Sequence, residues 1–133
     1  MPRHCYRLDN KKSLTDLKAG ATPDFSGDET LARATTDLLR EQLDGWQQRL
    51  FAEQRQRLLV VLQAMDTGGK DGLIRKVFTG VNPQGVDVTR FERPTPQELA
   101  HDYLWRVHAH VPPSGMIGIF NRSHYEDVVV VRV

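Results

Sequence analysis

The sequence predicts an α/β domain in which helices are layered on a parallel sheet. Three observations lead to this fold class. The run 58–62 is almost wholly apolar, a glycine-rich turn follows it, and strand-like and helix-like segments then alternate along the chain with short connections. Strands are expected at 58–62, within 85–94 and within 115–123, and helices at 70–80 and 95–112.

Each element has its own signal. The run "LLVVL" (58–62) is typical of a strand buried on both faces of a parallel sheet. The helix that follows is expected to stop at Gly80, before the breaker "NP". Thr95, Pro96 and Glu98 form an N-terminal capping pattern, which predicts one amphipathic helix running to Pro112.

The two ends of the chain are less regular. Residues 1–27 mix charge, Gly, Pro and Ser without a period, so we expect an N-terminal arm there and a domain over 28–133. A long amphipathic helix should begin after Ser26 or Asp28, either of which is a suitable cap, and its apolar stripe is expected to pack on its own domain. Valine propensity favours a strand in the tail, whereas Tyr125 and Val129 have helical spacing.

Composition narrows the class of protein. Eighteen basic and seventeen acidic residues leave a net charge of +1, so the whole chain does not resemble a nucleic-acid or membrane binder, and any polyanion site must be local. The single cysteine, Cys5, cannot form an internal disulfide, and no apolar run is long enough to span a bilayer. A cytoplasmic location is the default expectation.

The loop "MDTGGKDG" (65–72) carries the chemistry. Small residues let several backbone N–H groups point at an anion, a lysine adds charge, and the following helix presents its positive end. Here the lysine is Lys70, and the small residues are Gly68, Gly69 and Gly72. The usual phosphate-binding loop has Ser or Thr after the lysine to hold magnesium, where this chain has Asp71. An ordinary glycine turn at a helix start is the alternative.

In this chain a carboxylate is expected to take over the binding of magnesium from the usual Ser or Thr hydroxyl, and the candidate is Asp66. Asp66 lies within the loop, and carboxylate oxygens bind Mg²⁺ well. The third strand ends at Asn121 and Arg122, where phosphate binding is expected in a parallel sheet. Glu126 and Asp127 follow one turn later. Arg122 is also at the right spacing to pair with Glu126 as a purely structural ion bridge.

Longer stretches resemble a known family. "LLVVLQAMDTGGKDGLIRKVFTGVNPQGVDV", "HDYLWR" and "FNRSHYEDV" resemble the polyphosphate kinase 2 family, especially the branch that phosphorylates AMP and ADP, over roughly residues 28–133. The resemblance implies a P-loop kinase fold, Mg²⁺, and phosphoryl transfer between inorganic polyphosphate and AMP, ADP or ATP. It implies a helix after Ser123, a possible homo-oligomer, and a loop of the type "MDxxGKxG" in which Asp71 is normal.

The resemblance also assigns roles to residues of this chain. Asp66, Lys70 and Arg122 are expected to be catalytic, with Asp66, Asn121 and Asp127 as magnesium candidates. Asparagine stands where other branches have aspartate. The expected phosphate- or nucleotide-binding residues are Gly68, Gly69, Lys70, Asp71, Gly72, Arg75, Lys76 and Glu126. Arg75 and Lys76 have an equally good interpretation as solvated helix surface.

Two functional hypotheses remain open at this stage. The first is a polyphosphate:AMP/ADP phosphotransferase, or the N-terminal portion of one, because family members continue into a basic lid and further strands. The second is a truncated, non-catalytic remnant that binds nucleotide or polyphosphate, or associates with another chain through an incomplete sheet. A nucleoside monophosphate kinase that uses ATP is a weaker enzymatic alternative, since it would lack "GVNPQG" and "FNRSHYEDV".

Overall fold

A computed structural model describes residues 25–65 and 67–126. The chain divides into two compact units, residues 1–37 and 38–133. In the first unit, Asp28 rather than Ser26 caps the helix α1 (Glu29–Glu53), since its Oδ1 accepts the N–H of Leu31 at 2.8 Å. Within the described residues, no helix has the length and apolar character needed to cross a membrane.

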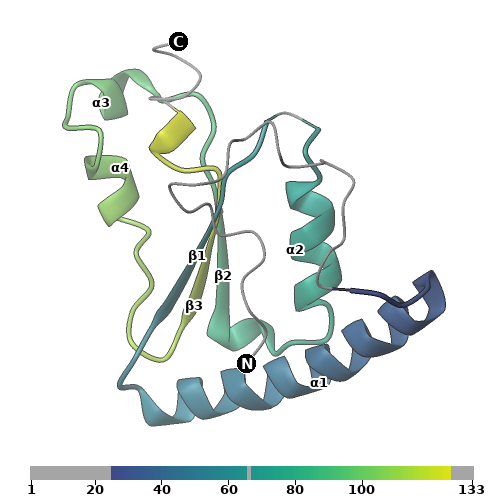
Figure 1. Cartoon of the computed structure of the whole chain (residues 1–133). Helices are drawn as coiled ribbons and strands as arrows, with labels where there is room; N and C mark the ends of the chain where they lie inside the picture. Colours follow the sequence, from purple (N-terminus) through teal and green to yellow (C-terminus); the bar gives the residue numbers. More distant parts are fainter. Residues whose placement is uncertain (1–24, 66, 127–133) are drawn as a thin grey trace, which may run out of the picture. The chain divides into compact units, whose positions relative to one another are not determined.

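The second unit is an α/β arrangement around a parallel three-stranded sheet (Figure 1), which confirms the predicted fold class. Its strands are β1 (Leu58–Leu62), β2 (Val86–Arg90) and β3 (Ile117–Asn121), in the spatial order β1-β3-β2. Leu58 and Val86 both align with Ile117, and Leu62 and Arg90 both align with Asn121. The three strands therefore end at the same edge of the sheet.

Helices connect the strands on the two sides of the sheet (Figure 1). Helix α2 (Lys70–Phe78) joins β1 to β2, and a one-turn 3₁₀ helix at Pro83–Gly85 precedes β2. The short helices α3 (Pro96–Leu99) and α4 (Trp105–His108) lie between β2 and β3. Gly80, at φ 88°, follows the end of α2 in the left-handed conformation that terminates helices.

The sequence prediction of one helix over 95–112 is wrong. The Thr95–Glu98 capping box is present, but it starts a helix of only four residues. Asp102 then accepts the N–H of Leu104 at 2.9 Å, a local turn that competes with helical hydrogen bonds and separates α3 from α4. Tyr125 and Glu126 are helical, in agreement with the family resemblance, and the valine-rich remainder of the tail lies outside the described residues.

Burial concentrates on β3. All five of its residues are buried, and Phe120 packs against Phe91 with ring centroids 4.8 Å apart in an edge-to-face arrangement, beside Val107. Gly118 has to be glycine, because a Cβ there would lie 2.8 Å from the Pro112 ring. The core therefore forms where the middle strand meets the segment that follows β2.

Two burial predictions fail. Strand β1 is at the edge of the sheet rather than inside it, and Leu58, Leu59 and Val61 are between 39% and 48% exposed. On the part of α1 in the second unit, the stripe residues Leu38, Leu39 and Trp46 are exposed as well. In place of the stripe, the polar Gln47 is buried in α1, where it packs on Gly85.

Candidate functional site

The carboxyl ends of the strands bring the glycine loop next to the end of β3. A cavity of about 300 Å³ lies there, lined by Thr67, Gly68, Gly69, Lys70, Asp71, Gly72, Arg90, Asn121 and Arg122. Seven of these nine residues were predicted from the sequence, and Thr67 and Arg90 were not. The structure therefore brings together loop and strand-end residues that are about 50 positions apart in the chain.

The loop owes its shape to backbone conformations that glycine adopts easily. Gly69 has φ 80° and immediately precedes α2, and Thr67 also has a positive φ of 64°. A Cβ on Gly68 would lie 2.9 Å from both the Ala64 side chain and the Met65 carbonyl oxygen, so the turn closes only around a glycine. The first amides of α2 have no partner inside the helix and are available to an anion.

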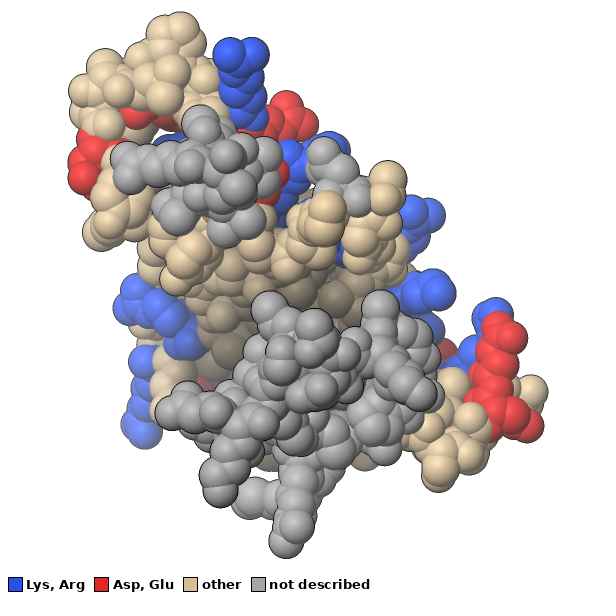
Figure 2. Space-filling view, turned by 45° about the horizontal axis from the view of Figure 1, so that its top comes forward, with Lys and Arg blue, Asp and Glu red and all other residues tan. Residues whose placement is uncertain are grey.

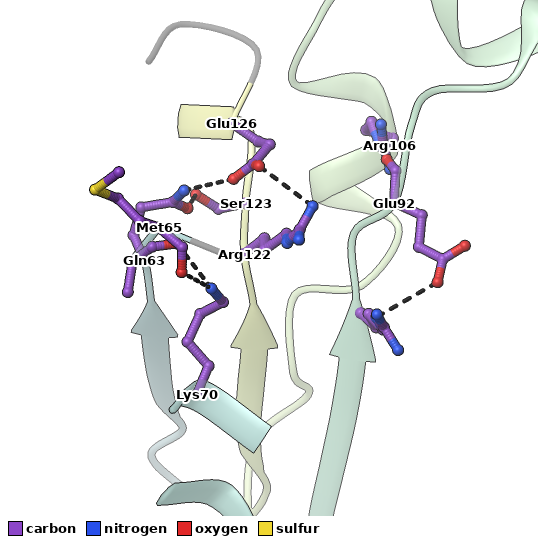
Figure 3. A network of polar contacts seen from close by, with 10 residues as sticks. Gln63, Met65, Lys70, Glu92, Arg106, Arg122, Ser123 and Glu126 are labelled. Carbon is purple, nitrogen blue, oxygen red and sulfur yellow. Dashed lines mark hydrogen bonds and ion pairs between the residues drawn. The ribbon is translucent and has the colours of Figure 1, made fainter. Parts of the chain in front are cut away.

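Lys70 is held at the base of this loop. Its ammonium group donates to the carbonyl oxygens of Ala64, at 2.7 Å, and Met65, at 2.9 Å (Figure 3). An ammonium has three N–H donors, so its two bonds to described residues leave a third donor that can bind a ligand oxygen. The carbonyl of Ala64, which stands where the usual loop has glycine, thus fixes the position of the positive charge.

Asp71 and Asn121 connect the loop to the middle strand. The Asn121 amide nitrogen donates to Asp71 Oδ1 at 2.5 Å, and Asn121 is only 5% exposed. Because Asn121 is the last residue of β3, this bond fixes the start of α2 against the strand end. The pair places one carboxylate and one amide carbonyl on the wall of the cavity.

Arg122 is positioned by a second set of polar contacts (Figure 3). Its Nη1 lies 3.2 Å from Glu126 Oε1, and the other Glu126 oxygen accepts a hydrogen bond from the Gln63 amide at 2.6 Å. Arg122 also has φ 68°, an uncommon conformation for a residue with a side chain. The structural ion bridge considered as an alternative is therefore present, yet Arg122 still lines the cavity.

Arg90 is the basic residue that the sequence interpretation missed. It ends β2 and aligns with Asn121 in the parallel register, so its position follows from the strand order. Its guanidinium Nε lies 3.4 Å from Glu92 at a well-exposed position. The available signal was its place within the second predicted strand (85–94), but the sequence revealed neither that this strand ends at Arg90 nor that it lies beside β3.

The remaining predicted site residues do not line the cavity or cannot be placed. Arg75 and Lys76 are exposed in the last turns of α2, away from the lining, as expected of solvated helix surface. Glu126 contacts Arg122 rather than the cavity. Asp66 and Asp127, both proposed as metal ligands, lie outside the described residues.

The charge around the cavity is locally positive. Among the described residues, its lining includes the cationic side chains of Lys70, Arg90 and Arg122 and one carboxylate, that of Asp71. Figure 2 shows that lysine and arginine side chains otherwise lie in several separate groups on the face that it presents. A polyanion would therefore meet a concentrated positive potential at the cavity, although the net charge of the chain is only +1.

A glycine loop between a parallel strand and a helix, with basic groups at the strand ends, is typical of α/β proteins that bind phosphate groups. Comparison with known proteins identifies the family. The family model "Polyphosphate kinase 2 (PPK2)" matches residues 26–133, and the chain belongs to this family.

Individual relatives agree with the family model. An AMP/ADP-polyphosphate phosphotransferase of Meiothermus ruber is 51% identical over 133 residues, which are all of this chain and 50% of that protein. An ADP-polyphosphate phosphotransferase of Rhodopseudomonas palustris is 51% identical over 100 residues, 73% of this chain and 35% of that protein. The chain thus spans half or less of the length of these curated relatives.

Solved structures support the same conclusion. The crystal structure of polyphosphate kinase 2 from Arthrobacter aurescens TC1 matches with a TM-score of 0.92 at 40% identity, over 98% of this chain and 48% of that one. A putative polyphosphate kinase 2 from Pseudomonas aeruginosa matches with a TM-score of 0.73 at 28% identity, over 85% of this chain and 24% of that one.

Proposed function

We propose that this chain supplies the phosphate-binding part of a polyphosphate:nucleotide phosphotransferase, which moves a phosphoryl group between inorganic polyphosphate and AMP or ADP. The observation that carries the proposal is the juxtaposition of Lys70, in the glycine loop, with Arg122, at the end of β3, in one cavity. The names of the relatives, which include AMP/ADP- and ADP-polyphosphate phosphotransferases, supply the substrate class.

Phosphoryl transfer mainly requires that the protein hold donor and acceptor in line and neutralise the negative charge of their phosphate groups. The terminal P–O–P linkage of polyphosphate breaks, and a new P–O bond forms to a phosphate oxygen of the nucleotide, with donor and acceptor in line. The loop amides and the remaining Lys70 N–H bind phosphate oxygens. Arg122, held in place by Glu126, stabilises the negative charge on the group being transferred, and Arg90 attracts the phosphate chain.

Magnesium belongs to the same proposal. Mg²⁺ prefers oxygen ligands and is usually held by one or two protein oxygens together with substrate phosphates and water. The Asp71 carboxylate and the Asn121 amide oxygen fit this donor set, and Asp66 is a further candidate on sequence grounds. When bound, the ion would screen the repulsion between the two phosphorylated substrates.

Lys70→Ala is the direct test, with Lys76→Ala as the matched control. Both residues are lysines of α2, but Lys70 lines the cavity and Lys76 does not. Binding of long-chain polyphosphate to the 133-residue chain should weaken about tenfold or more in Lys70→Ala, the loss expected for a charge-assisted hydrogen bond. Lys76→Ala should stay within about twofold of the parent, because exposed charges contribute little.

Equal losses in both variants would show a diffuse electrostatic interaction and refute the specific site. ATP formation from ADP, polyphosphate and Mg²⁺ is then measured on the same preparations. Activity in the parent but not in Lys70→Ala would establish a phosphotransferase. Tight, Lys70-dependent polyphosphate binding without ATP formation would favour the second hypothesis, a binding module without catalysis.

A further inference from the structure

Gln63 is the first residue after β1 and does not line the cavity. Its side-chain Nε2 donates to Glu126 Oε2 at 2.6 Å (Figure 3). Its Oε1 accepts from Ser123 Oγ at 3.5 Å, which is long for a hydrogen bond. A single amide side chain therefore connects the end of β1 to the turn after β3, which carries Arg122 and Glu126.

The segment 62–65 also holds two of the cationic groups that line the cavity, through its backbone. The carbonyl of Leu62 accepts the Arg122 N–H at 3.0 Å. The carbonyls of residues 64 and 65 accept from the Lys70 ammonium group at 2.7 Å and 2.9 Å. Gln63 lies between these two anchoring points, so its side chain belongs to the same short stretch that fixes the positions of both charges.

Glu126 meets Arg122 with one of its two carboxylate oxygens. Glu126 Oε1 lies 3.2 Å from Arg122 Nη1, and Oε2 is the oxygen that accepts from Gln63. When a carboxylate pairs with arginine through both oxygens, two parallel N–H···O bonds form, and the guanidinium offers fewer N–H groups to a phosphate. The hydrogen bond from Gln63 occupies the second oxygen and so opposes that arrangement. An amide suits this position because it donates a hydrogen bond without adding a charge.

We infer that Gln63 is a positioning residue for phosphate binding by Arg122. By holding Glu126 Oε2, Gln63 restricts Glu126 to a single-oxygen contact with the guanidinium of Arg122, which lines the cavity. Without the amide, Oε2 turns to the guanidinium and competes there with phosphate oxygens. The inference rests on the proposed phosphate-binding function and extends it to a residue outside the cavity lining.

Gln63→Met is the test, because methionine is close to glutamine in size but has no amide. Binding of long-chain polyphosphate to the 133-residue chain is measured by isothermal titration calorimetry. The affinity should fall about threefold to tenfold, since Arg122 then has to release one Glu126 oxygen in order to bind phosphate. Gln63→Asn is a second variant, whose amide is one methylene too short to make the same bond, and it should show a similar loss.

Gln48→Met is the matched control. Gln48 Nε2 donates to Asp44 Oδ2 at 2.7 Å, an exposed amide–carboxylate hydrogen bond like that of Gln63, but both residues are on α1 and outside the cavity lining. The affinity of this variant for polyphosphate should stay within about 1.5-fold of the parent. Circular dichroism establishes that each variant is folded.

A double-mutant cycle separates positioning through Glu126 from a general loosening of the loop. In a Glu126→Ala background there is no carboxylate to hold, so adding Gln63→Met should have no further effect on polyphosphate affinity. An undiminished loss in that background overturns the inference, because Gln63 would then act by stabilising the loop.

The same titrations distinguish failure of this inference from failure of the proposed function. If Lys70→Ala weakens polyphosphate binding and Gln63→Met does not, the inference is refuted and the proposed function stands. If the folded parent does not bind polyphosphate, the proposed function is refuted, and the inference that rests on it is refuted as well.

Discussion

Strands β1 and β3 have similarly apolar sequences but opposite environments. The run "LLVVL" of β1 is the more hydrophobic, yet three of its five residues are exposed, whereas "IGIFN" of β3 is buried at every position. The difference comes from strand order, because within residues 25–65 and 67–126 β3 has a neighbouring strand on each side and β1 has one. Hydrophobicity therefore shows that a strand is suited to burial, and the sheet decides which strand is covered.

The largest expected difference between β1 and β3 is in the free energy of unfolding that is lost when one side chain of each strand is truncated to alanine. Ile119 is 0% exposed, so Ile119→Ala should lower the free energy of unfolding by about 3 kcal/mol, through lost burial and a residual cavity. Val61 is 42% exposed, and Val61→Ala should cost less than about 1 kcal/mol. Urea denaturation of both variants measures the difference. Similar losses would mean that β1 is already covered in the isolated chain.

A substitution at Gly85 tests how tightly the turn before β2 packs against Gln47 of α1. A Cβ at this position would lie 1.5 Å from Gln47 Nε2, and the buried Gln47 has little room to move. Gly85→Ala should therefore destabilise the fold by about 2 kcal/mol through overpacking. Gly45 on α1 is the matched control, because a Cβ there meets nothing within 4 Å. Gly45→Ala should be neutral or stabilise by up to about 1 kcal/mol in the same denaturation assay.

The Thr95 capping box tests whether local contacts stabilise the segment between β2 and β3. Thr95 Oγ1 accepts the Glu98 N–H at 3.3 Å, and Glu98 Oε2 accepts the Thr95 N–H at 2.6 Å. Thr95→Ala should cost about 1 kcal/mol, and Thr95→Ser should recover most of it. Thermal melts of the two variants provide the comparison. No difference between alanine and serine would show that packing around Val107, rather than the cap, holds this segment.

The smallest expected effect is a pH dependence of stability that comes from Glu98 in the same capping box. The hydrogen bond from the Thr95 backbone lowers the pKa of Glu98 below its ordinary value. A carboxyl whose pKa is lowered by folding contributes stability above the unfolded-state pKa, and that stability is lost as pH falls through the folded-state pKa. The melting temperature of Glu98→Gln should thus lie slightly below that of the parent at neutral pH and converge with it in acid. A constant difference would contradict the assignment.

Sequence alone determined the local features of this protein. The three strands, the glycine loop, the start of α2 at Lys70 and the cap at Thr95 all depend on neighbouring residues, and all were predicted. The phosphate-type loop and its lysine were recognisable for the same reason. Local interactions are encoded by short stretches, so they are legible before the fold is known.

Tertiary structure decided what depends on contacts between distant segments. The strand order placed β3 in the middle and β1 at the edge, which reversed the expected burial of β1. It brought Arg90 to the cavity, and it left Arg75 and Lys76 outside. The bond between Asn121 and Asp71 joins residues 50 positions apart. The sequence around each residue does not show that the two side chains lie close together in space. Their proximity is set by the register of strands that meet only when the sheet forms.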